Sequence, residues 1–245
     1  MKNIFVATDN KVIFDAFKRI VANKKNVVFE YFCSEKSVKL FENEIVLGQI
    51  KPISMKENLE FFITNYSFGI SCHSKQLFPT ELVNTIVCIN IHPGLNPYNR
   101  GWFPQVFSII NGLPIGATIH VMDEKIDYGD IIIQKEVKVN SYENSLDIYN
   151  KVQEKEIELF KEVIDDILEN KFSRTKPGPE GNYNSIQDYK AMCEIKLDQK
   201  VTMKEAINYL RAMTHPPYKN AYFIDEDGDK IYLTLNLEKE CFETK

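Results

Sequence analysis

The amino-terminal part of the chain alternates short apolar runs with amphipathic segments, and this alternation most constrains the fold. The runs typical of strands cover 3–8, 26–33 and 69–72, and the segments typical of helices cover 11–21, 35–44 and 56–66. Strands that alternate with helices favour a parallel sheet with right-handed crossovers. We therefore predict an α/β fold, with a Rossmann-like, mostly parallel sheet that has helices on both faces. Ligands of such sheets bind beyond the carboxyl ends of the strands.

The stretch from Ile86 to Ile133 holds the residues best suited to chemistry. It opens on an apolar, β-branched run typical of a buried strand, in which Asn90 and His92, two residues apart, point to the same side. A Pro-Gly pair then ends the strand. Further along, Asp127 lies in a glycine-containing loop just before another apolar run. An amide, an imidazole and a carboxylate are the groups of a proton-handling site.

Four motifs follow one another in this stretch. They are Asn-Ile-His-Pro-Gly at 90–94, Asn-Pro-Tyr-Asn-Arg-Gly at 96–101, Gly-Ala-Thr-Ile-His at 116–120 and Ile-Asp-Tyr-Gly-Asp at 126–130. In this order and spacing they resemble the folate-dependent formyltransferase family, which includes glycinamide ribonucleotide, methionyl-tRNA and sugar N-formyltransferases. The second motif, continued by Trp-Phe-Pro, is most similar to the branch that acts on dTDP-linked amino-dideoxy sugars. The resemblance covers 6–168 and returns at 215–223.

The resemblance implies the formyltransferase fold and a reaction. A formyl group would move from N10-formyltetrahydrofolate to the amino group of a dTDP-linked amino-dideoxy sugar, without a metal. On resemblance alone the favoured acceptor is dTDP-4-amino-4,6-dideoxyglucose, and the 3-amino isomer stays open. The resemblance also implies a homodimer and a role in O-antigen, and so lipopolysaccharide, biosynthesis. The alternatives are a formyltetrahydrofolate hydrolase and a nucleotide-sugar or folate binder without turnover.

The resemblance gives the catalytic roles to Asn90, His92 and Asp127. The amide N–H of Asn90 is expected to bind the oxyanion that forms when the sugar amine attacks the formyl carbon. His92 is expected to take the amine proton, or to stabilise the oxyanion and pass the proton on. Asp127 is expected to orient His92, raise its basicity and hold a relaying water. Taken singly, each residue also fits turn chemistry or a buried polar network.

The loop after the strand at 69–72 lines the folate pocket in similar enzymes, largely through backbone groups and apolar side chains. The candidate folate-binding residues are Gln76, Leu77, Phe78, Ile126 and Asp130.

Three polar residues are candidates for binding the phosphates of the sugar nucleotide. Asn10 can cap the helix at 11–21, and the amino terminus of that helix can also receive a phosphate. Lys75 either reaches a phosphate or is a solvated charge. Arg100 precedes a predicted helix, where its guanidinium can bind an oxyanion through two N–H groups.

Three aromatic residues are candidates for contacts with the sugar nucleotide. Tyr222, and after it Tyr218, could stack on thymine, and Trp102 could line the substrate surface. Core packing is the alternative for all three. His120 alternates with apolar neighbours, which favours a structural histidine whose hydrogen bonds are satisfied.

Composition limits the partners. The 245-residue chain has a net charge of −5, which argues against a nucleic-acid partner and so against a tRNA acceptor. The first apolar run is too short for the hydrophobic region of a signal peptide, so none is expected, and no apolar stretch approaches membrane-spanning length. The cysteines are scattered without a Cys-x-x-Cys pair, at Cys33, Cys72, Cys88, Cys193 and Cys241. We therefore expect a reduced, cytoplasmic protein without disulfides, a zinc site or membrane contact.

The carboxyl-terminal part is expected to form a small separate unit. The elements predicted after the central strand are a helix at 101–111, strands at 115–122 and 131–139, helices at 144–170 and 203–213, and a hairpin that pairs 221–225 with 230–237. The run 176–181 is rich in proline and glycine and is typical of a linker. We therefore predict a catalytic domain, 1–178, and a C-terminal helix-and-hairpin subdomain, 179–245. The subdomain is too small for the second domain of methionyl-tRNA enzymes.

Overall fold

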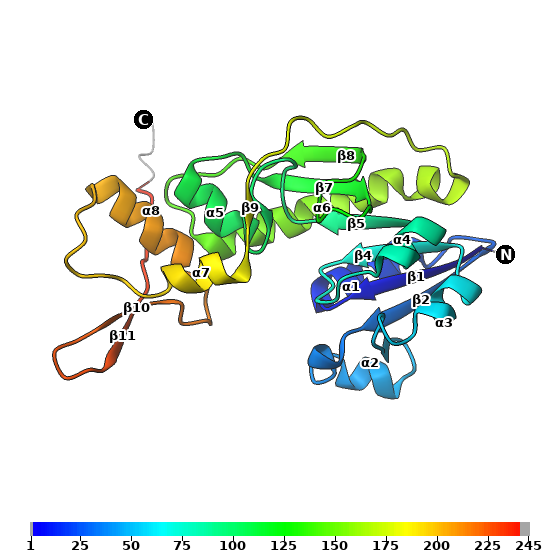
Figure 1. Cartoon of the computed structure of the whole chain (residues 1–245), viewed down its shortest axis with the longest axis horizontal. Helices are drawn as coiled ribbons and strands as arrows, with labels where there is room; N and C mark the ends of the chain where they lie inside the picture. Colours follow the sequence, from blue (N-terminus) through cyan, green and yellow to red (C-terminus); the bar gives the residue numbers. More distant parts are fainter. Residues whose placement is uncertain (1, 241–245) are drawn as a thin grey trace.

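A computed structural model describes residues 2–240, so that Cys241 lies outside the described part of the chain. Its main feature is a seven-stranded sheet with the order β3-β2-β1-β4-β5-β7-β8 (Figure 1). The strands are β1 (Lys2–Thr8), β2 (Val27–Cys33), β3 (Lys51–Pro52), β4 (Phe68–Cys72), β5 (Val87–His92), β7 (Gly116–Val121) and β8 (Ile131–Glu136). The first five in this order pair in parallel, whereas β7 is antiparallel to β5 and β8 to β7. The predicted mostly parallel α/β fold is confirmed.

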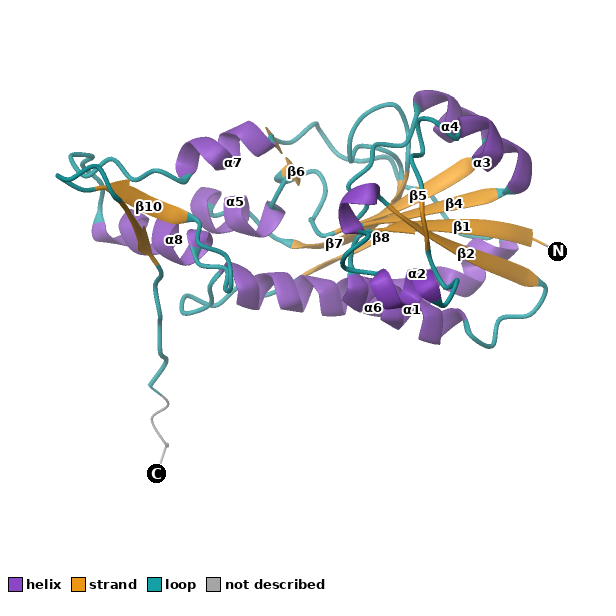
Figure 2. Cartoon of the chain, turned by 90° about the horizontal axis from the view of Figure 1, so that it is seen from below, coloured by secondary structure: helices purple, strands orange, loops and turns teal. Residues whose placement is uncertain are grey.

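Helices cover both faces of the sheet (Figure 2). One face carries α1 (Lys11–Val21) and α6 (Ser145–Glu169), and the other carries α3 (Leu59–Asn65) and α4 (Thr80–Thr85). Each face has its own apolar cluster. Phe17 stacks on Phe160 in the first cluster, and Phe5 contacts Phe62 in the second. Strand β4 is buried at every residue, as expected for a strand with helices on both sides.

The direction of the chain across the sheet reverses between β1 and β4. From β1 the chain continues outward to β2, whereas from β4 it continues the other way to β5. Asn10 follows β1 and His73 follows β4, and the N–H of Asp9 donates to the carbonyl of His73 over 3.3 Å. The carboxyl ends of strands at such a reversal are where ligands bind in open α/β sheets. The next strand, β5, ends at His92.

The remaining elements are short. They are η1 (Glu35–Ser37), α2 (Glu42–Val46), β6 (Arg100–Gly101), α5 (Pro104–Asn111), β9 (Tyr183–Asn184), α7 (Ile186–Met192), α8 (Met203–Met213) and the hairpin of β10 (Ala221–Ile224) and β11 (Lys230–Leu233). The C-terminal helices and the hairpin extend away from the sheet (Figures 1 and 2). Within residues 2–240, no helix is both long and apolar enough to cross a bilayer.

Helix α6 joins the sheet to these C-terminal elements. It begins with a reciprocal cap, because the side chain of Asn144 accepts from the N–H of Asp147 and the Asp147 carboxylate accepts from the N–H of Asn144. Its second half packs on the sheet, whereas Ile148 and Val152 in its first half belong to a separate cluster with α5 and α8. At 1.5 Å per residue its 25 residues span roughly 38 Å. One helix therefore belongs to both cores.

Three local predictions differ from the structure. The helix predicted at 35–44 is divided into η1 and α2. The helix predicted from 101 begins at Pro104, because Phe103 has a left-handed backbone, with φ at +50°, that cannot continue a helix. Helices α4 and α7 were not predicted, since segments of 6 and 7 residues are too short to show a helical period.

Candidate active site

Strand β5 and the loop between β7 and β8 bring the three predicted catalytic residues together. Asn90 and His92 lie two residues apart on β5, and Asp127 belongs to the loop. The amide Nδ2 of Asn90 donates to Oδ1 of Asp127 over 3.0 Å. Nδ1 of His92 lies 3.6 Å from Oδ2 of the same carboxylate. One carboxylate therefore faces both the amide and the imidazole, although 37 residues separate Asn90 from Asp127.

The backbone of Asp127 is held from several sides. Its φ of +52° is left-handed, which asparagine and aspartate tolerate better than most residues. Nδ2 of Asn96 donates to the carbonyl of Asp127 over 2.8 Å, and the N–H of Gly101 donates to Oδ2 over 3.3 Å. Nη1 of Arg100 donates to the carbonyl of Ile126 over 3.1 Å. The second motif, 96–101, thus positions the carboxylate of the fourth.

The surroundings set the protonation states of His92 and Asp127. Burial lowers the pKa of His92, and the Asp127 carboxylate only partly opposes this effect. Burial works to raise the pKa of Asp127, but the interactions with His92 and His120 and the hydrogen bond from Gly101 outweigh it and hold that pKa well below its usual range. At neutral pH the site therefore combines a neutral imidazole with a carboxylate, so that His92 can accept a proton.

The second nitrogen of His92 has no hydrogen-bond partner among the described residues. Nε2 is buried and unpaired, and the whole residue is 3% exposed. A Cβ added to Gly94 would lie 2.3 Å from this atom, so only glycine leaves room for the ring. An unpaired, buried acceptor is costly in a folded protein. A reacting group that binds next to Nε2 of His92 would supply the missing hydrogen-bond partner.

His120 is a site residue that the sequence did not identify. It lies on β7 directly opposite Asn90, and its Nε2 is 3.6 Å from Oδ1 of Asp127. Its Nδ1 donates to the carbonyl of Val121 over 2.9 Å. Its alternation with apolar residues favoured a structural role, and only the antiparallel pairing of β7 with β5 brings it to the carboxylate.

The candidate folate-binding residues lie in two places, in the segment after β4 and in the loop between β7 and β8 that contains Asp127. Leu77 and Ile126 are 75% and 45% exposed. Phe78 packs against the second-face cluster. The side chain of Gln76 donates from Nε2 to the carbonyl of Ile53 and accepts at Oε1 from the N–H of Met55. The Asp130 carboxylate forms an ion pair with Lys176 over 3.0 Å. Their contact with a folate stays a prediction.

The polar substrate candidates already have partners in the protein. Oδ1 of Asn10 accepts from the N–H of Ile13 and so caps α1, as predicted. Nζ of Lys75 donates to Oγ of Ser37 over 3.2 Å. Arg100 is 5% exposed, and besides contacting the Asp127 loop it pairs with Glu180 over 3.0 Å. Its binding of an oxyanion stays a prediction.

The aromatic candidates lie in different places. Trp102 is 45% exposed and directly follows Gly101, whose N–H donates to the Asp127 carboxylate. Tyr218 is 66% exposed and lies beside His215, with 6.0 Å between ring centroids. Tyr222 is part of the hairpin, with Nζ of Lys230 4.1 Å from its ring centroid. The hairpin extends away from the sheet (Figure 1), so Tyr222 is the more remote of the two tyrosines.

A second polar cluster, also not predicted, lies where the strand order reverses. Nε2 of His73 is 2.8 Å from Oε2 of Glu156, which is fully buried on α6. The hydroxyl of Tyr149 lies 3.3 Å from Nδ1 of His73 and accepts from Nδ2 of Asn10 over 2.9 Å. These residues come from α1, β4 and α6, and only the tertiary fold brings them together.

Cys72 adds a thiol to this cluster. The ligand atoms of Cys72, His73 and Glu156 all lie within 4.8 Å of one another, a spacing that could hold a metal ion. Two ligand atoms on a tetrahedral zinc ion, with bonds of about 2.0–2.1 Å, stand roughly 3.3 Å apart. His73 and Glu156 are 2.8 Å apart, the distance of a direct hydrogen bond. The cluster as it stands is therefore a hydrogen-bonded carboxylate–histidine pair.

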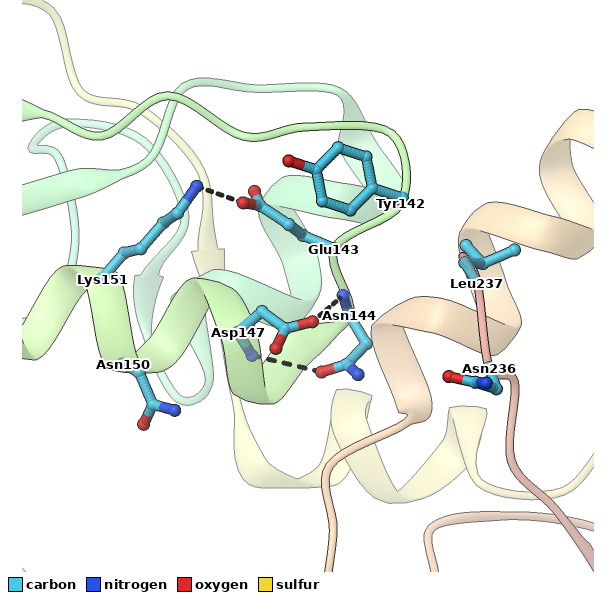
Figure 3. Close-up of a pocket in the computed structure, with 8 residues that line it drawn as sticks. All are labelled: Tyr142, Glu143, Asn144, Asp147, Asn150, Lys151, Asn236 and Leu237. Atoms are coloured by element: carbon cyan, nitrogen blue, oxygen red, sulfur yellow. Dashed lines mark hydrogen bonds and ion pairs between the residues drawn. The ribbon is translucent and has the colours of Figure 1, made fainter. Parts of the chain in front are cut away.

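A pocket of about 500 Å³ lies away from the catalytic residues, at the start of α6 (Figure 3). Residues of the C-terminal segment, Asn236 and Leu237, form its other side. Its charged groups are already paired, since Lys151 contacts Glu143 and the Asp147 carboxylate belongs to the helix cap. The pocket therefore offers no unpaired group for catalysis.

Residues 68–164 match the family described as formyl transferase, and residues 188–239 match the N-formyltransferase dimerization C-terminal domain. A dTDP-4-amino-4,6-dideoxyglucose formyltransferase of Mycobacterium tuberculosis (strain ATCC 25618 / H37Rv) is 38% identical over 197 residues, which cover 79% of this chain and 84% of the relative. Two solved structures are similar over nearly their whole length. A 4-N formyltransferase from Francisella tularensis is 68% identical, with a TM-score of 0.96 and coverage of 98% of this chain and 99% of its own. A sugar N-formyltransferase from Shewanella sp. FDAARGOS_354 is 40% identical, with a TM-score of 0.93 and coverage of 98% and 100%.

These likenesses extend across both the sheet and the C-terminal elements, and they agree with the motifs that carry Asn90, His92 and Asp127. The chain belongs to the formyl transferase family, and within it to the sugar N-formyltransferases.

Proposed function

We propose that this enzyme transfers the formyl group of N10-formyltetrahydrofolate to the amino group of dTDP-4-amino-4,6-dideoxyglucose. The observation that carries the proposal is the convergence of Asn90 and His92 on the Asp127 carboxylate, with Nε2 of His92 buried and unpaired. The names of the 38% identical relative and of the 68% identical structure support the position of the amine at C4.

The three residues divide the reaction between them. The bound folate supplies the formyl carbon, which the neutral sugar amine attacks. Nδ2 of Asn90 has two hydrogens, and with one donated to Asp127 the other is left for the oxyanion. His92 takes the proton that the amine nitrogen loses as the new C–N bond forms. It returns that proton to the leaving nitrogen as the old C–N bond breaks, so that protons balance over the cycle.

The two substrates have separate supports in the chain. The exposed side chains of Leu77, in the loop after β4, and of Ile126, next to Asp127, offer apolar surface to a pterin ring. Asn10, His73 and Tyr149 line the point where the strand order reverses, which favours the sugar nucleotide there. Tyr218 is exposed next to this group and is better situated than Tyr222 for stacking on thymine.

The proposed contact with thymine is tested by two alanine variants. Stacking of an aromatic ring on a base contributes about 1–3 kcal/mol. We expect Tyr218→Ala to weaken binding of dTDP about tenfold, and Tyr222→Ala to leave it within twofold, when the dissociation constants are measured by calorimetry. The opposite order would restore Tyr222 as the stacking residue.

A homodimer is part of the proposal. Residues 188–239 match a dimerization domain, and the hairpin exposes Ile224, Ile231 and Tyr232, each with 39–43% of its surface accessible. We propose that this hairpin forms the contact between two copies.

The free cysteines and the absence of a membrane-spanning helix among residues 2–240 are compatible with the cytoplasm. The formylated sugar would enter O-antigen, and so lipopolysaccharide, biosynthesis.

The function is tested by offering the enzyme the folate donor with a panel of dTDP-linked amino sugars, and by following the mass of the products. Formylation of the 4-amino sugar in preference to the 3-amino isomer is expected. Release of formate without an acceptor would identify a hydrolase instead. Binding of both ligands without any product would identify a non-catalytic nucleotide-sugar binder.

A further inference from the structure

Before it enters the C-terminal subdomain, the chain passes along residues 96–102, which contact the Asp127 segment. We call residues 180–184 the strap and residues 96–102 the loop. The N–H of Arg100 donates to the carbonyl of Asn182 over 3.1 Å, and the N–H of Trp102 donates to the carbonyl of Asn184 over 2.9 Å. A Cβ on Gly181 would lie 2.1 Å from a loop carbonyl oxygen. The run predicted as a linker, 176–181, therefore leads directly into the strap, which pairs with the loop through backbone hydrogen bonds.

Asn99 is the centre of this contact. It is fully buried and has a left-handed backbone, with φ at +47°. Its N–H donates to Oδ1 of Asn182 over 2.9 Å, and Nδ2 of Asn182 donates back to Oδ1 of Asn99 over 2.6 Å. Asparagine tolerates this left-handed region better than most residues, and hydrogen bonds to its backbone and side chain hold it there. Asn182 contributes to this support from the strap, whereas Ser108 and Asn111 hydrogen bond with the Asn99 side chain from α5.

The loop passes this support on to the Asp127 carboxylate. Next to Asn99, Arg100 donates from Nη1 to the carbonyl of Ile126 and from Nη2 to Glu180 of the strap, over 3.1 and 3.0 Å. Then Gly101 donates its N–H to Oδ2 of Asp127 over 3.3 Å. A chain of direct contacts thus runs from the strap to the carboxylate.

We propose that the strap is a positioning element of catalysis, in which Asn182 and Glu180 act through the loop to hold the Asp127 carboxylate against His92. The proposal rests on the proposed function, because formyl transfer is its readout. The start of the C-terminal subdomain would therefore contribute to the chemistry through the loop.

The distances make this support consequential. Oδ2 of Asp127 is 3.6 Å from Nδ1 of His92, beyond the usual range of about 2.7–3.2 Å for a hydrogen bond. A displacement of about 1 Å in a catalytic group can cost on the order of 10²-fold in rate. The Asp127 carboxylate is therefore already beyond hydrogen-bond distance of His92, and a further displacement would weaken its action on the imidazole. Residues 96–102, which support the Asp127 segment, are thus expected to affect the rate.

The test is the Asn182→Ala variant of the full chain, compared with Asn220→Ala. Asn220 belongs to the same subdomain and donates to the carbonyl of Met213 over 3.0 Å, away from the loop. We expect Asn182→Ala to lower kcat about tenfold or more, with the KM of both substrates within about threefold. Asn220→Ala is expected to retain the wild-type kcat.

The pH profile separates positioning from a general loss of stability. The charged and titratable groups that act on His92 are Asp127, His120, His73 and Arg100, and Asn182→Ala removes none of them. As the Asp127 carboxylate retreats, it raises the pKa of His92 less, so the acid limb of kcat should move to lower pH. A loss of kcat without this movement, or an equal loss in Asn220→Ala, would overturn the proposal.

A second variant covers the case in which Asn182→Ala does not fold. Glu180→Gln changes a side chain that is 58% exposed, and we expect it to move the acid limb in the same direction by a smaller amount. If Glu180→Gln folds and the acid limb of its kcat profile stays at the wild-type pH, the proposed positioning role of the strap is contradicted. The wild type is the reference for the function itself, because absence of formyl transfer there rejects the proposed function and not the strap.

Discussion

At the scale of single residues, the site depends on several groups that share one carboxylate. Asn90 donates to Asp127, Nδ1 of His92 lies 3.6 Å from Oδ2 of this carboxylate, and Nε2 of His120 lies 3.6 Å from Oδ1. Burial alone would favour the protonated acid, but these neighbours and the N–H of Gly101 keep the pKa of Asp127 low. The negative charge is therefore permanent, and it partly opposes the effect of burial on His92.

We expect the activity to depend on pH through His92. The ring must be neutral to accept a proton, and burial lowers its pKa from the ordinary value of 6.5. kcat/KM should therefore rise with pH through a midpoint below 6.5 and be level at pH 7. Asp127→Asn removes the charge that raises this pKa, so its midpoint should lie still lower and its kcat should fall. Profiles of both enzymes from about pH 5 to 8 check this, and a midpoint that moves upward in Asp127→Asn contradicts it.

Asn90 should contribute to the rate more than to folding. We expect Asn90→Ala to lower kcat by about 10²–10³-fold, because a lost oxyanion donor costs that much. The control is Asn84→Ala, an exposed asparagine whose amide donates to Glu124 over 3.1 Å. Steady-state kinetics and thermal unfolding of both variants check this. A near-normal kcat in Asn90→Ala would exclude its amide from the oxyanion site.

At the scale of elements, strand β5 and the turn after it act as one unit. The strand points Asn90 and His92 to the same side, and Gly94 in the turn leaves the space that the His92 ring occupies. The turn also brings Asn96 to within 2.8 Å of the carbonyl of Asp127. The Pro-Gly pair therefore ends the strand and also makes room for the His92 ring.

The alanine variant of Gly94 tests this role of the turn. A Cβ there would lie 2.3 Å from Nε2 of His92, so the ring or the turn must move. We expect a loss of at least tenfold in kcat, and a loss of stability of about 1–3 kcal/mol, as is usual for overpacking. Gly178→Ala is the control, since nothing lies within 4 Å of a Cβ at that position. Equal kinetics in the two variants would refute the prediction.

At the scale of the whole molecule, α6 and the strap connect the catalytic sheet to the C-terminal subdomain. The first half of α6 shares a core with α5 and α8, and its second half packs on the sheet (Figure 2). Contacts of α6 thus link the sheet to the C-terminal elements, and the boundary predicted between residues 178 and 179 stays a prediction. The hairpin extends beyond this set and is free to meet a second copy (Figure 1).

The dimer contact is tested by a charge on the hairpin. Ile231 is 40% exposed on β11, and we expect Ile231→Glu to convert the dimer into a monomer because a buried charge in an apolar contact is costly. Val46→Glu is the matched control, since Val46 is 82% exposed on α2, away from the hairpin. Light scattering after gel filtration measures both masses. A dimeric Ile231→Glu, or a monomeric wild type, contradicts the proposed contact.

Much of this molecule follows from the sequence alone, because its main signals are local. The alternation of strands and helices predicted the α/β sheet, and the period of two on β5 predicted that Asn90 and His92 share a side. The helices at 11–21 and 203–213 have the predicted bounds, since they are amphipathic and carry clear caps. The motifs also pointed to Asp127, which the structure places in contact with Asn90.

The rest was decided by contacts between distant segments. His120 meets Asp127 only because β7 runs antiparallel beside β5, and no local pattern fixes that pairing. His73 meets Glu156 across 83 residues, and Asn99 meets Asn182 across the same separation. The sequence determined which side chains each element presents and therefore the chemistry available to the chain. The tertiary structure decided which of them share a charge or a hydrogen bond, since such interactions depend on distances that the order of residues does not specify.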